Sequence, residues 1–413
     1  MSSLTSSLAK ARRIRPRRPA AHTRAFVGDI QARVAAGELE HAHALARGTH
    51  RLIPDSAVIA DLLVATREAR GFTASALDLA RENAARHLDW LRRRPTAAHG
   101  PVAPSQRIFL SGFFYSGSGA VLDFLGGLEG TARWAPGDEI RLIRSPGGVA
   151  EVVTTLDRDN DLHPQVLVDH YLHLVGRKIT GQPRRTYSPW NRVNTLSRRL
   201  WRDPVAAGYL SVLLESFLEL CGRWQQGRLS RSWLEGHIAE VLGQAFDRAA
   251  AGAGVDCLVL DQAVPARRLH LAGLVPPSPF VVVHRDPRDQ FAEVQKVVQR
   301  QQGHHPKWHT ASSFAEVYRA DREAAARRIK RIIDRGYQVI TVAFEDFVCD
   351  HDRESRRLLQ ALGLEDRSVA DGEVVFDAEV SRKNVGKHAW LLSPDDRAVI
   401  TAALPEFLHG EAG

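Results

Sequence analysis

The chain has 413 residues, of which 44% are hydrophobic and 25% charged, a composition typical of folded globular domains and not of disordered or collagen-like chains. It contains no run of about 18 to 20 apolar residues, so no membrane-spanning helix is predicted. The three cysteines are far apart, which argues against a disulfide framework and favours a reducing, cytoplasmic setting. The length predicts more than one domain.

The net charge of +8 is concentrated at the start of the chain. Residues 1–20 contain six Lys and Arg side chains and no acid. This composition predicts a disordered basic tail, and it leaves residues 21–413 nearly neutral. Proteins that bind nucleic acid more often carry their positive charge on a folded face, so the distribution argues against a nucleic-acid partner.

Residues 21–94 show a helical pattern in which Ala, Leu and Arg recur every three to four residues. The segment that begins at Gly37 returns 34 residues later at Gly71, with small residues at corresponding places. This period resembles a tetratricopeptide repeat, which would offer a surface for a protein partner, and a plain helical bundle remains the alternative. Residues 95–106 are rich in Pro and predict a linker.

Four short apolar segments predict buried strands in the rest of the chain, at residues 107–111, 255–260, 279–284 and 338–343. Helical patterns separate them, notably at residues 313–334. Strands that alternate with helices predict an α/β domain over residues 107–413, with a central parallel sheet flanked by helices.

A Gly- and Ser-rich loop, Gly112 to Gly119, stands between the first strand and a helix. A strand, a glycine-rich loop and a helix together place backbone N–H groups around an anion such as phosphate. The spacing of the glycines is that of a nucleotide-binding P-loop, but Ser118 occupies the place of its lysine. That lysine contacts the β- and γ-phosphates, so its absence argues against ATP or GTP hydrolysis.

Two further segments carry groups that suit phosphate. The strand at 279–284 runs into Arg285, Asp286, Pro287, Arg288 and Asp289 at the start of a helix, where a guanidinium is well placed for a second phosphate. Near the end of the chain, residues 381–387 combine three cations with a glycine that permits a close backbone approach.

Together these motifs, between residues 107 and 390, resemble the sulfotransferases that use 3′-phosphoadenosine 5′-phosphosulfate (PAPS) and have a P-loop-like fold. The resemblance implies two groups of donor-binding residues. A loop would hold the 5′-phosphosulfate, and Arg285 with Arg288 would hold the 3′-phosphate, together with a C-terminal loop familiar from bacterial members. The loop residues are Tyr115, Ser116, Gly117, Ser118 and Gly119, and the C-terminal residues are Lys383, Asn384, Gly386 and Lys387.

The sequence departs from the family pattern at two places. Tyr115 stands where the family has a Lys or Arg that neutralises the leaving group, and it offers a hydrogen bond without charge. Glu293 stands where a serine is expected, and it would repel a phosphate unless it points away.

The catalytic base is the second question that the motifs address. Residues 136–144 are similar to the base segment of the tyrosylprotein sulfotransferases, which implies Glu139 as the base and Arg141 beside it, with Arg141 or Arg144 as the replacement for the missing loop cation. His170 and His173 are the alternative bases. No metal-binding motif occurs, so no metal is predicted.

Residues 174–202 contain eight cations and no acid, with Tyr187 and Trp190 among them, which suits an anionic saccharide or a solvated insertion. We therefore expect a sulfotransferase that moves a sulfuryl group from PAPS to a hydroxyl of a carbohydrate or glycolipid. Two alternatives stay open, a kinase-like phosphotransferase of related fold and a non-catalytic helical-repeat scaffold with a degenerate donor site.

Overall fold

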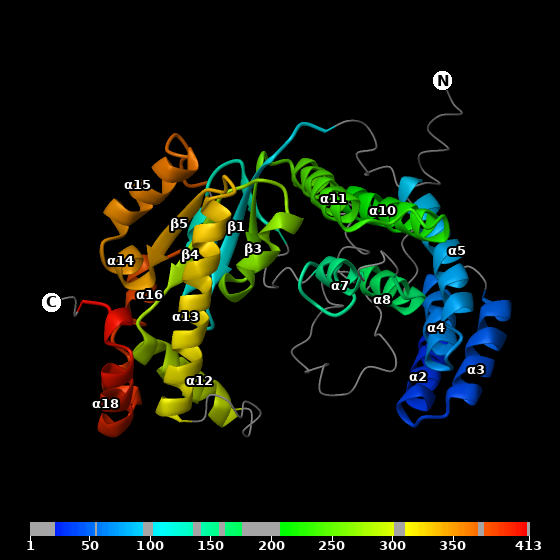
Figure 1. Ribbon diagram of the computed structural model, residues 1–413, viewed down its shortest axis with the longest axis horizontal. Helices are drawn as coiled ribbons and strands as arrows, with labels where there is room; N and C mark the ends of the chain where they lie inside the picture. The colour runs from blue at the N-terminus through cyan, green and yellow to red at the C-terminus, as the bar shows by residue number, and fades with distance from the viewer. Residues whose placement is uncertain are drawn as a thin grey trace.

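The computed structural model describes residues 21–53, 56–93, 102–134, 142–156, 162–175, 207–300, 310–370 and 376–410. An α/β part built around a sheet and a part made of helices lie side by side (Figure 1). The residues that carry the predicted phosphate-binding motifs belong to the α/β part.

Five parallel strands form the sheet, in the order β2-β3-β1-β4-β5. The strands are β1 (Gln106–Gly112), β2 (Thr131–Arg133), β3 (Cys257–Asp261), β4 (Phe280–His284) and β5 (Val339–Ala343). The central strand β1 pairs with β3 on one side and β4 on the other, so Phe109 lies opposite both Leu260 and Phe280. This sheet confirms the predicted α/β class, and the four predicted strands differ from the observed ones by one or two residues at their ends.

Alternate residues of the strands enter two separate apolar clusters, one on each face of the sheet. Phe109, Leu260 and Phe280 pack with helix α11 (Arg231–Ala253) and the 3₁₀ segment η2 (Ala266–Leu274). Ile108 and Val281 pack on the other face with α6 (Ser118–Leu125), α14 (Phe344–Cys349) and α15 (His351–Leu362). Because both faces are covered, the buried stretches of β1, β3 and β4 are mostly apolar, as is typical of parallel sheets.

The remaining helices of the α/β part lie beyond β4 and β5. Phe291, Phe314 and Ile400 form a third apolar cluster among them. These helices are α12 (Pro287–Arg300), α13 (Ala311–Ile333), α16 (Ala378–Arg382), α17 (His388–Leu391), α18 (Pro394–Ala403) and η4 (Pro405–Phe407).

The N-terminal helices form two hairpins that repeat the same turn. They are α2 (Ala21–Ala35), α3 (Leu39–Leu52), α4 (Ala57–Ala69) and α5 (Thr73–Arg92). Gly37 joins α2 to α3 with φ of 81°, and Gly71 joins α4 to α5 with φ of 82°. Both angles lie in the left-handed region that favours glycine, so the 34-residue spacing in the sequence corresponds to a repeated turn geometry. The tetratricopeptide resemblance itself stays a prediction.

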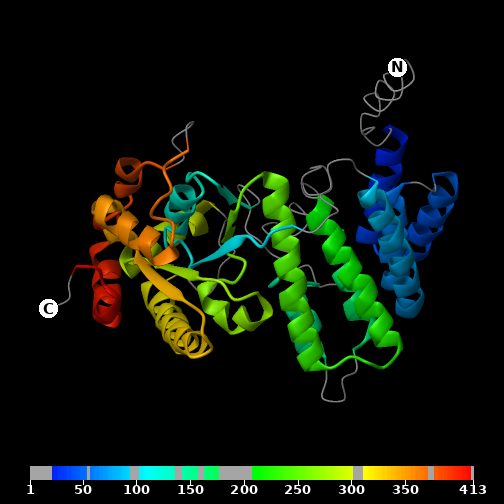
Figure 2. The same ribbon diagram turned by 90° about the horizontal axis from the view of Figure 1, so that it is seen from above.

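Helix α5 packs against the helices that follow the sheet's first two strands, across the predicted linker. These helices are α8 (Pro164–Leu174) and α10 (Ala207–Gln225), and α7 (Val149–Thr155) packs against α8. Leu77 and Leu91 of α5 share one apolar cluster with Tyr171 of α8 and Phe217 of α10, and the Tyr171 hydroxyl donates to Asp61 of α4 at 2.6 Å. Figure 2 shows α10 and α11 between the sheet and the N-terminal helices. These contacts are more extensive than the linker composition predicts, and the domain boundary at residue 94 stays a prediction.

We expect a protein that begins at Val102 to lose solubility, because removal of α2–α5 exposes the buried faces of α8 and α10. Each large apolar side chain so exposed loses roughly 1.5 to 3 kcal/mol of transfer free energy. The measurement is the soluble yield and thermal unfolding of this shortened protein beside the full chain. A soluble shortened protein with an unchanged unfolding temperature would show that the N-terminal helices are an independent domain.

Candidate functional site

The site candidates lie at the edge of the sheet where the parallel strands end. Residues 113–117 connect β1 to α6, Gln262 follows β3, Arg285 follows β4 and Phe344 follows β5. Parallel sheets bind ligands at this edge, because the connections to the following helices meet there.

The loop after β1 has a tight conformation that its glycines make possible. A Cβ atom at Gly112 would lie 2.7 Å from the Ser116 Oγ atom and 2.8 Å from the Ser118 Oγ atom, so the loop folds back over this residue. Gly117 has φ of 80°, and a Cβ there would lie 2.2 Å from the ring of Phe344. Tyr115, which is not a glycine, also has positive φ, at 54°. Such strained backbone is often found at ligand-binding sites.

Two buried donors beside this loop have no hydrogen-bond partner in the part of the chain that the structure describes. They are the Ser116 hydroxyl and the Nε atom of Arg285. Both are next to the carbonyl of Tyr115, since Ser116 follows it in the chain and the Arg285 Nη1 atom donates to it at 3.4 Å. Buried donors without partners are unfavourable unless a ligand or water satisfies them, so these two fit an anionic ligand group.

Arg285 connects the loop to the C-terminal part of the chain. Its side chain is only 4% exposed. Besides Tyr115, its guanidinium donates to the carbonyl of Asn384 and forms an ion pair with Asp289 at 3.6 Å. The guanidinium carbon lies 5.0 Å from the ring centroid of Phe344. The structure therefore brings Arg285 together with Tyr115, Ser116 and Asn384, which the sequence had assigned to one binding site.

Asp289 fixes the backbone of the C-terminal loop. Its carboxylate accepts from the N–H of Gly386 at 2.8 Å, and from the N–H and the Nδ1 atom of His388, both at 2.9 Å. Burial alone would raise the pKa of Asp289, but these hydrogen bonds and the charge of Arg285 hold it below its ordinary value. Gly386 has φ of 71°, which suits the sharp turn at this point.

Glu293 is paired with lysines. Its carboxylate accepts from the Nζ atom of Lys387 at 2.7 Å, and the Nζ atom of Lys296 lies 3.5 Å away. Burial raises the pKa of Glu293, but Lys387 and Lys296 lower it further than burial raises it. The negative charge of Glu293, which the sequence analysis expected to repel a phosphate, is therefore balanced by Lys387 and Lys296.

Arg288 and Lys383 occupy different environments. The Arg288 guanidinium donates to both carboxylate oxygens of Asp286, at 3.0 and 2.7 Å. Lys383 is exposed, at the end of α16. Arg288 is thus engaged in an ion pair with the buried Asp286, while Lys383 remains accessible to a ligand.

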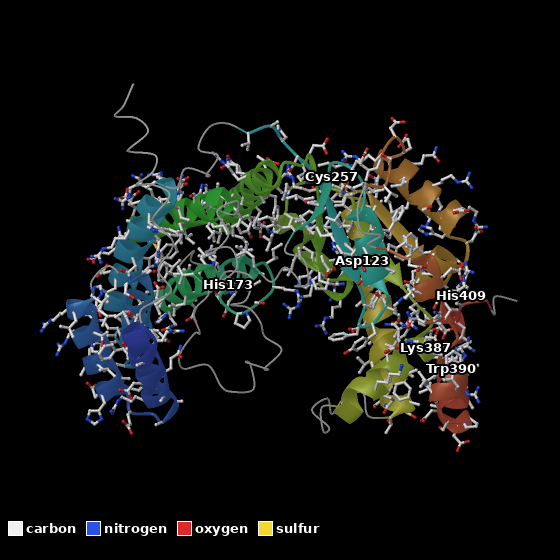
Figure 3. All side chains as sticks on the ribbon, turned by 180° about the vertical axis from the view of Figure 1, so that it is seen from behind. Asp123, His173, Cys257, Lys387, Trp390 and His409 are labelled. Carbon is white, nitrogen blue, oxygen red and sulfur yellow. The ribbon has the colours of Figure 1, made fainter. Side chains whose placement is uncertain are left out.

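The predicted base Glu139 and its neighbour Arg141 lie outside the described residues. The alternative bases, His170 and His173, are buried in α8. Burial lowers the pKa of His170 to about 4 and that of His173 to about 3. The Nδ1 atom of His170 contacts the carbonyl of Gly147 at 2.7 Å. Figure 3 shows His173 in the helical part, well separated from Lys387, so an acceptor would reach these histidines only through the protein interior.

Sequence reasoning missed two glutamines that shape the loop. Gln262 follows β3 with φ of 51°, its amide nitrogen donates to the Ser118 Oγ atom at 3.2 Å, and its carbonyl accepts from the Nε atom of Arg144 at 3.0 Å. The side chain of Gln290 in α12 donates to the carbonyl of Phe114. The available signal was position, because Gln262 is the second residue after the strand predicted at 255–260.

The parallel sheet flanked by helices, with a glycine-containing loop after its central strand, defines an α/β protein. Within it, residues 261–368 match a model of the sulfotransferase family. This segment extends from the end of β3 beyond α15, and its similarity to the sulfotransferase family agrees with the resemblance inferred from the motifs.

Three solved structures show weak similarity. The sulfotransferase domain of the Synechococcus PCC 7002 olefin synthase is 13% identical, with 75% of this chain and 97% of that chain covered and a TM-score of 0.33. Sulfotransferase STF1 of Mycobacterium tuberculosis H37Rv is 15% identical, with 85% and 98% covered and a TM-score of 0.31. Sulfotransferase STF9 of Mycobacterium avium is 14% identical, with 84% and 89% covered and a TM-score of 0.32.

No curated protein matches the sequence. Among the described residues, no helix has the length and apolar character that crossing a membrane requires.

We expect the substitution Ser116→Ala to separate ligand binding from stability. The hydroxyl has no partner among the described residues, so its removal should leave the free energy of unfolding unchanged or raise it by about 1 kcal/mol. Affinity for 3′-phosphoadenosine 5′-phosphate (PAP) should fall by about tenfold to a hundredfold, the effect of one hydrogen bond to a charged group. Calorimetry and thermal unfolding measure the two quantities.

Ser111→Ala is the matched control, because the buried Ser111 hydroxyl donates to the carbonyl of Val264 at 2.6 Å. It should lose about 1 kcal/mol of stability and retain PAP affinity. A Ser116→Ala protein that is destabilised but binds PAP normally would show that this hydroxyl has only a structural role.

Proposed function

We propose that this protein transfers a sulfuryl group from PAPS to a hydroxyl of a carbohydrate or glycolipid, in the cytoplasm. The family match supports sulfuryl transfer as the reaction. The observation that carries the proposal for the donor is the pair of buried donors without partners, Ser116 Oγ and Arg285 Nε, at the loop after β1.

The residues present fit a bound PAPS molecule in two places. The first is the loop of residues 115–119, where the fold over Gly112 leaves N–H groups and the Ser116 hydroxyl at the beginning of α6. It would hold the 5′ end. The second is formed by Arg285 and the C-terminal loop with Lys383, Asn384, Gly386 and Lys387, which would hold the 3′-phosphate. When bound, PAPS supplies the sulfuryl group and a phosphate that leaves with negative charge.

Arg288 is a helper in this proposal and not a direct phosphate ligand, since Asp286 already accepts two of its hydrogen bonds. Arg285 both holds the two loops together and offers a donor to the nucleotide. Its Nη atoms hold Tyr115 and Asn384, which places the two loops against each other, and its Nε atom retains one donor for the nucleotide.

The proposed base is Glu139, which takes the proton of the acceptor hydroxyl as the new S–O bond forms. A neighbouring cation compensates for the charge that Tyr115 does not supply. Arg141 and Arg144 are the candidates, and Arg144 contacts the loop through Gln262. The in-line transfer then needs only a hydroxyl acceptor, a base and donors around the leaving phosphate.

Calorimetry with PAP and with ATP tests the proposed function. The full chain should bind PAP and show at least tenfold weaker binding of ATP, because the proposed site has groups for a 3′-phosphate and lacks the P-loop lysine. Preference for ATP would instead indicate a phosphotransferase. Binding of neither nucleotide would favour a scaffold in which the N-terminal helices bind a protein partner.

Glu139→Gln tests the base. The amide keeps the shape of the side chain and is far less basic, so turnover with labelled PAPS should fall by roughly 10² to 10⁴, while PAP affinity stays within about threefold. Asp138→Asn is the matched control and should have a mild effect. Full turnover in Glu139→Gln, with a large loss in a His170→Ala or His173→Ala protein that still folds, would transfer the role to a histidine.

A further inference from the structure

Two aromatic rings project outward from the proposed donor loop. Phe114 is 39% exposed and Tyr115 is 40% exposed, and their ring centroids lie 6.2 Å apart. The backbone of the same two residues is held by other contacts, because the Phe114 carbonyl accepts from Gln290 and the Tyr115 carbonyl accepts from Arg285. The loop is thus fixed through its backbone and presents two partly exposed aromatic rings.

Three arginines surround this aromatic surface. The guanidinium carbon of Arg267 lies 4.7 Å from the ring centroid of Phe114. The Nη1 atom of Arg268 donates to the carbonyl of Arg144 at 2.7 Å. Arg144 in turn contacts the loop through Gln262. Two separate segments, the beginning of η2 and residues 142–148, therefore deliver positive charge to the same edge of the loop.

The arginines lie close enough to affect each other. Partial burial, and after it the charge of Arg144, lowers the pKa of Arg268. No carboxylate of the described residues forms an ion pair with Arg268. On the neighbouring helix α13, Asp321 interacts electrostatically with Arg267 and Arg328, and the cationic form of His270 is disfavoured by burial and by Arg328 and Arg268. Cations this close repel each other, and a bound anion relieves the repulsion.

We propose that Arg268 binds an oxyanion of the acceptor, a phosphate, sulfate or carboxylate group, while Phe114 and Tyr115 pack against its sugar ring. This inference rests on the proposed function and specifies the acceptor as an anionic saccharide. The planar guanidinium matches the oxygens of these groups with two parallel hydrogen bonds. The aromatic rings supply the apolar surface on which a sugar face packs. The anion would lie beside the loop that holds the donor and not within it.

The test compares three small probes on the full chain, with and without saturating PAP. The probes are glucose 6-phosphate, glucuronate and methyl glucoside, which share a sugar ring and differ in charge. We expect calorimetry at low salt to detect the two anionic sugars and not the neutral one. PAP should not displace them, because they occupy a different site from the donor.

Arg268→Gln should weaken the binding of the anionic sugars by about tenfold to a hundredfold and leave PAP affinity unchanged. Arg356→Gln is the matched control, because it removes the same charge from an exposed position on α15, over the other face of the sheet. Anionic sugars that bind equally to both variants, or no better than methyl glucoside to the wild type, would overturn the inference. This result is distinguishable from failure of the proposed function, which appears as absent PAP binding.

A second experiment identifies the kind of molecule that carries the anion. Vesicles of phosphatidylcholine with phosphatidylinositol present the same sugar-phosphate chemistry on a lipid. Vesicle binding that Arg268→Gln abolishes assigns the site to a glycolipid, and sensitivity of the free sugars alone assigns it to a soluble saccharide. A variant that binds both vesicles and free sugars as the wild type does would exclude Arg268 from acceptor recognition.

Discussion

The architecture of the candidate site depends on the buried guanidinium of Arg285. It is held by the backbone of the loop after β1, the backbone of the C-terminal loop and the carboxylate of Asp289. An arginine that is 4% exposed requires nearly complete pairing, because an unpaired buried charge is strongly unfavourable. Arg285 therefore joins Tyr115, which lies 170 residues before it in the chain, to Asn384, which lies 99 residues after it.

The acidic residues near Arg285 have a complementary role. Asp289 accepts from the backbone and side chain of His388, and Glu293 accepts from Lys387. In a site intended for phosphate, carboxylates are normally unfavourable. Here they orient the segment that bears the cations, so that the exposed Lys383 remains for a ligand. The acids are thus consistent with an anion site because each is already neutralised by a partner of its own.

Much of the fold could be predicted because the strands are buried on both faces and read as short apolar runs. The strand β2 could not, since three residues are too few to show a period. Of the site, the sequence indicated Ser116, Arg285 and Asn384 through spacing, and the structure brings them together. It could not indicate Gln262 or the pairing of Glu293 with Lys387, because these depend on contacts between segments far apart in the chain. The contact of α5 with α10 could not be predicted either, because these helices are also far apart in the chain.

The strand order has a consequence for how the protein forms during synthesis. Between β1 and its partner β3, the chain passes through β2 and five described helices, so Phe109 meets Leu260 only after about 150 further residues have left the ribosome. Helices α2–α5 need only local contacts and can form before then. The apolar strand β1 stays unpaired until β3 has been synthesised. During this interval a chaperone or the neighbouring helices have to shield it from other chains. The order of synthesis thus makes β1, the central strand of the finished sheet, the most vulnerable one during assembly.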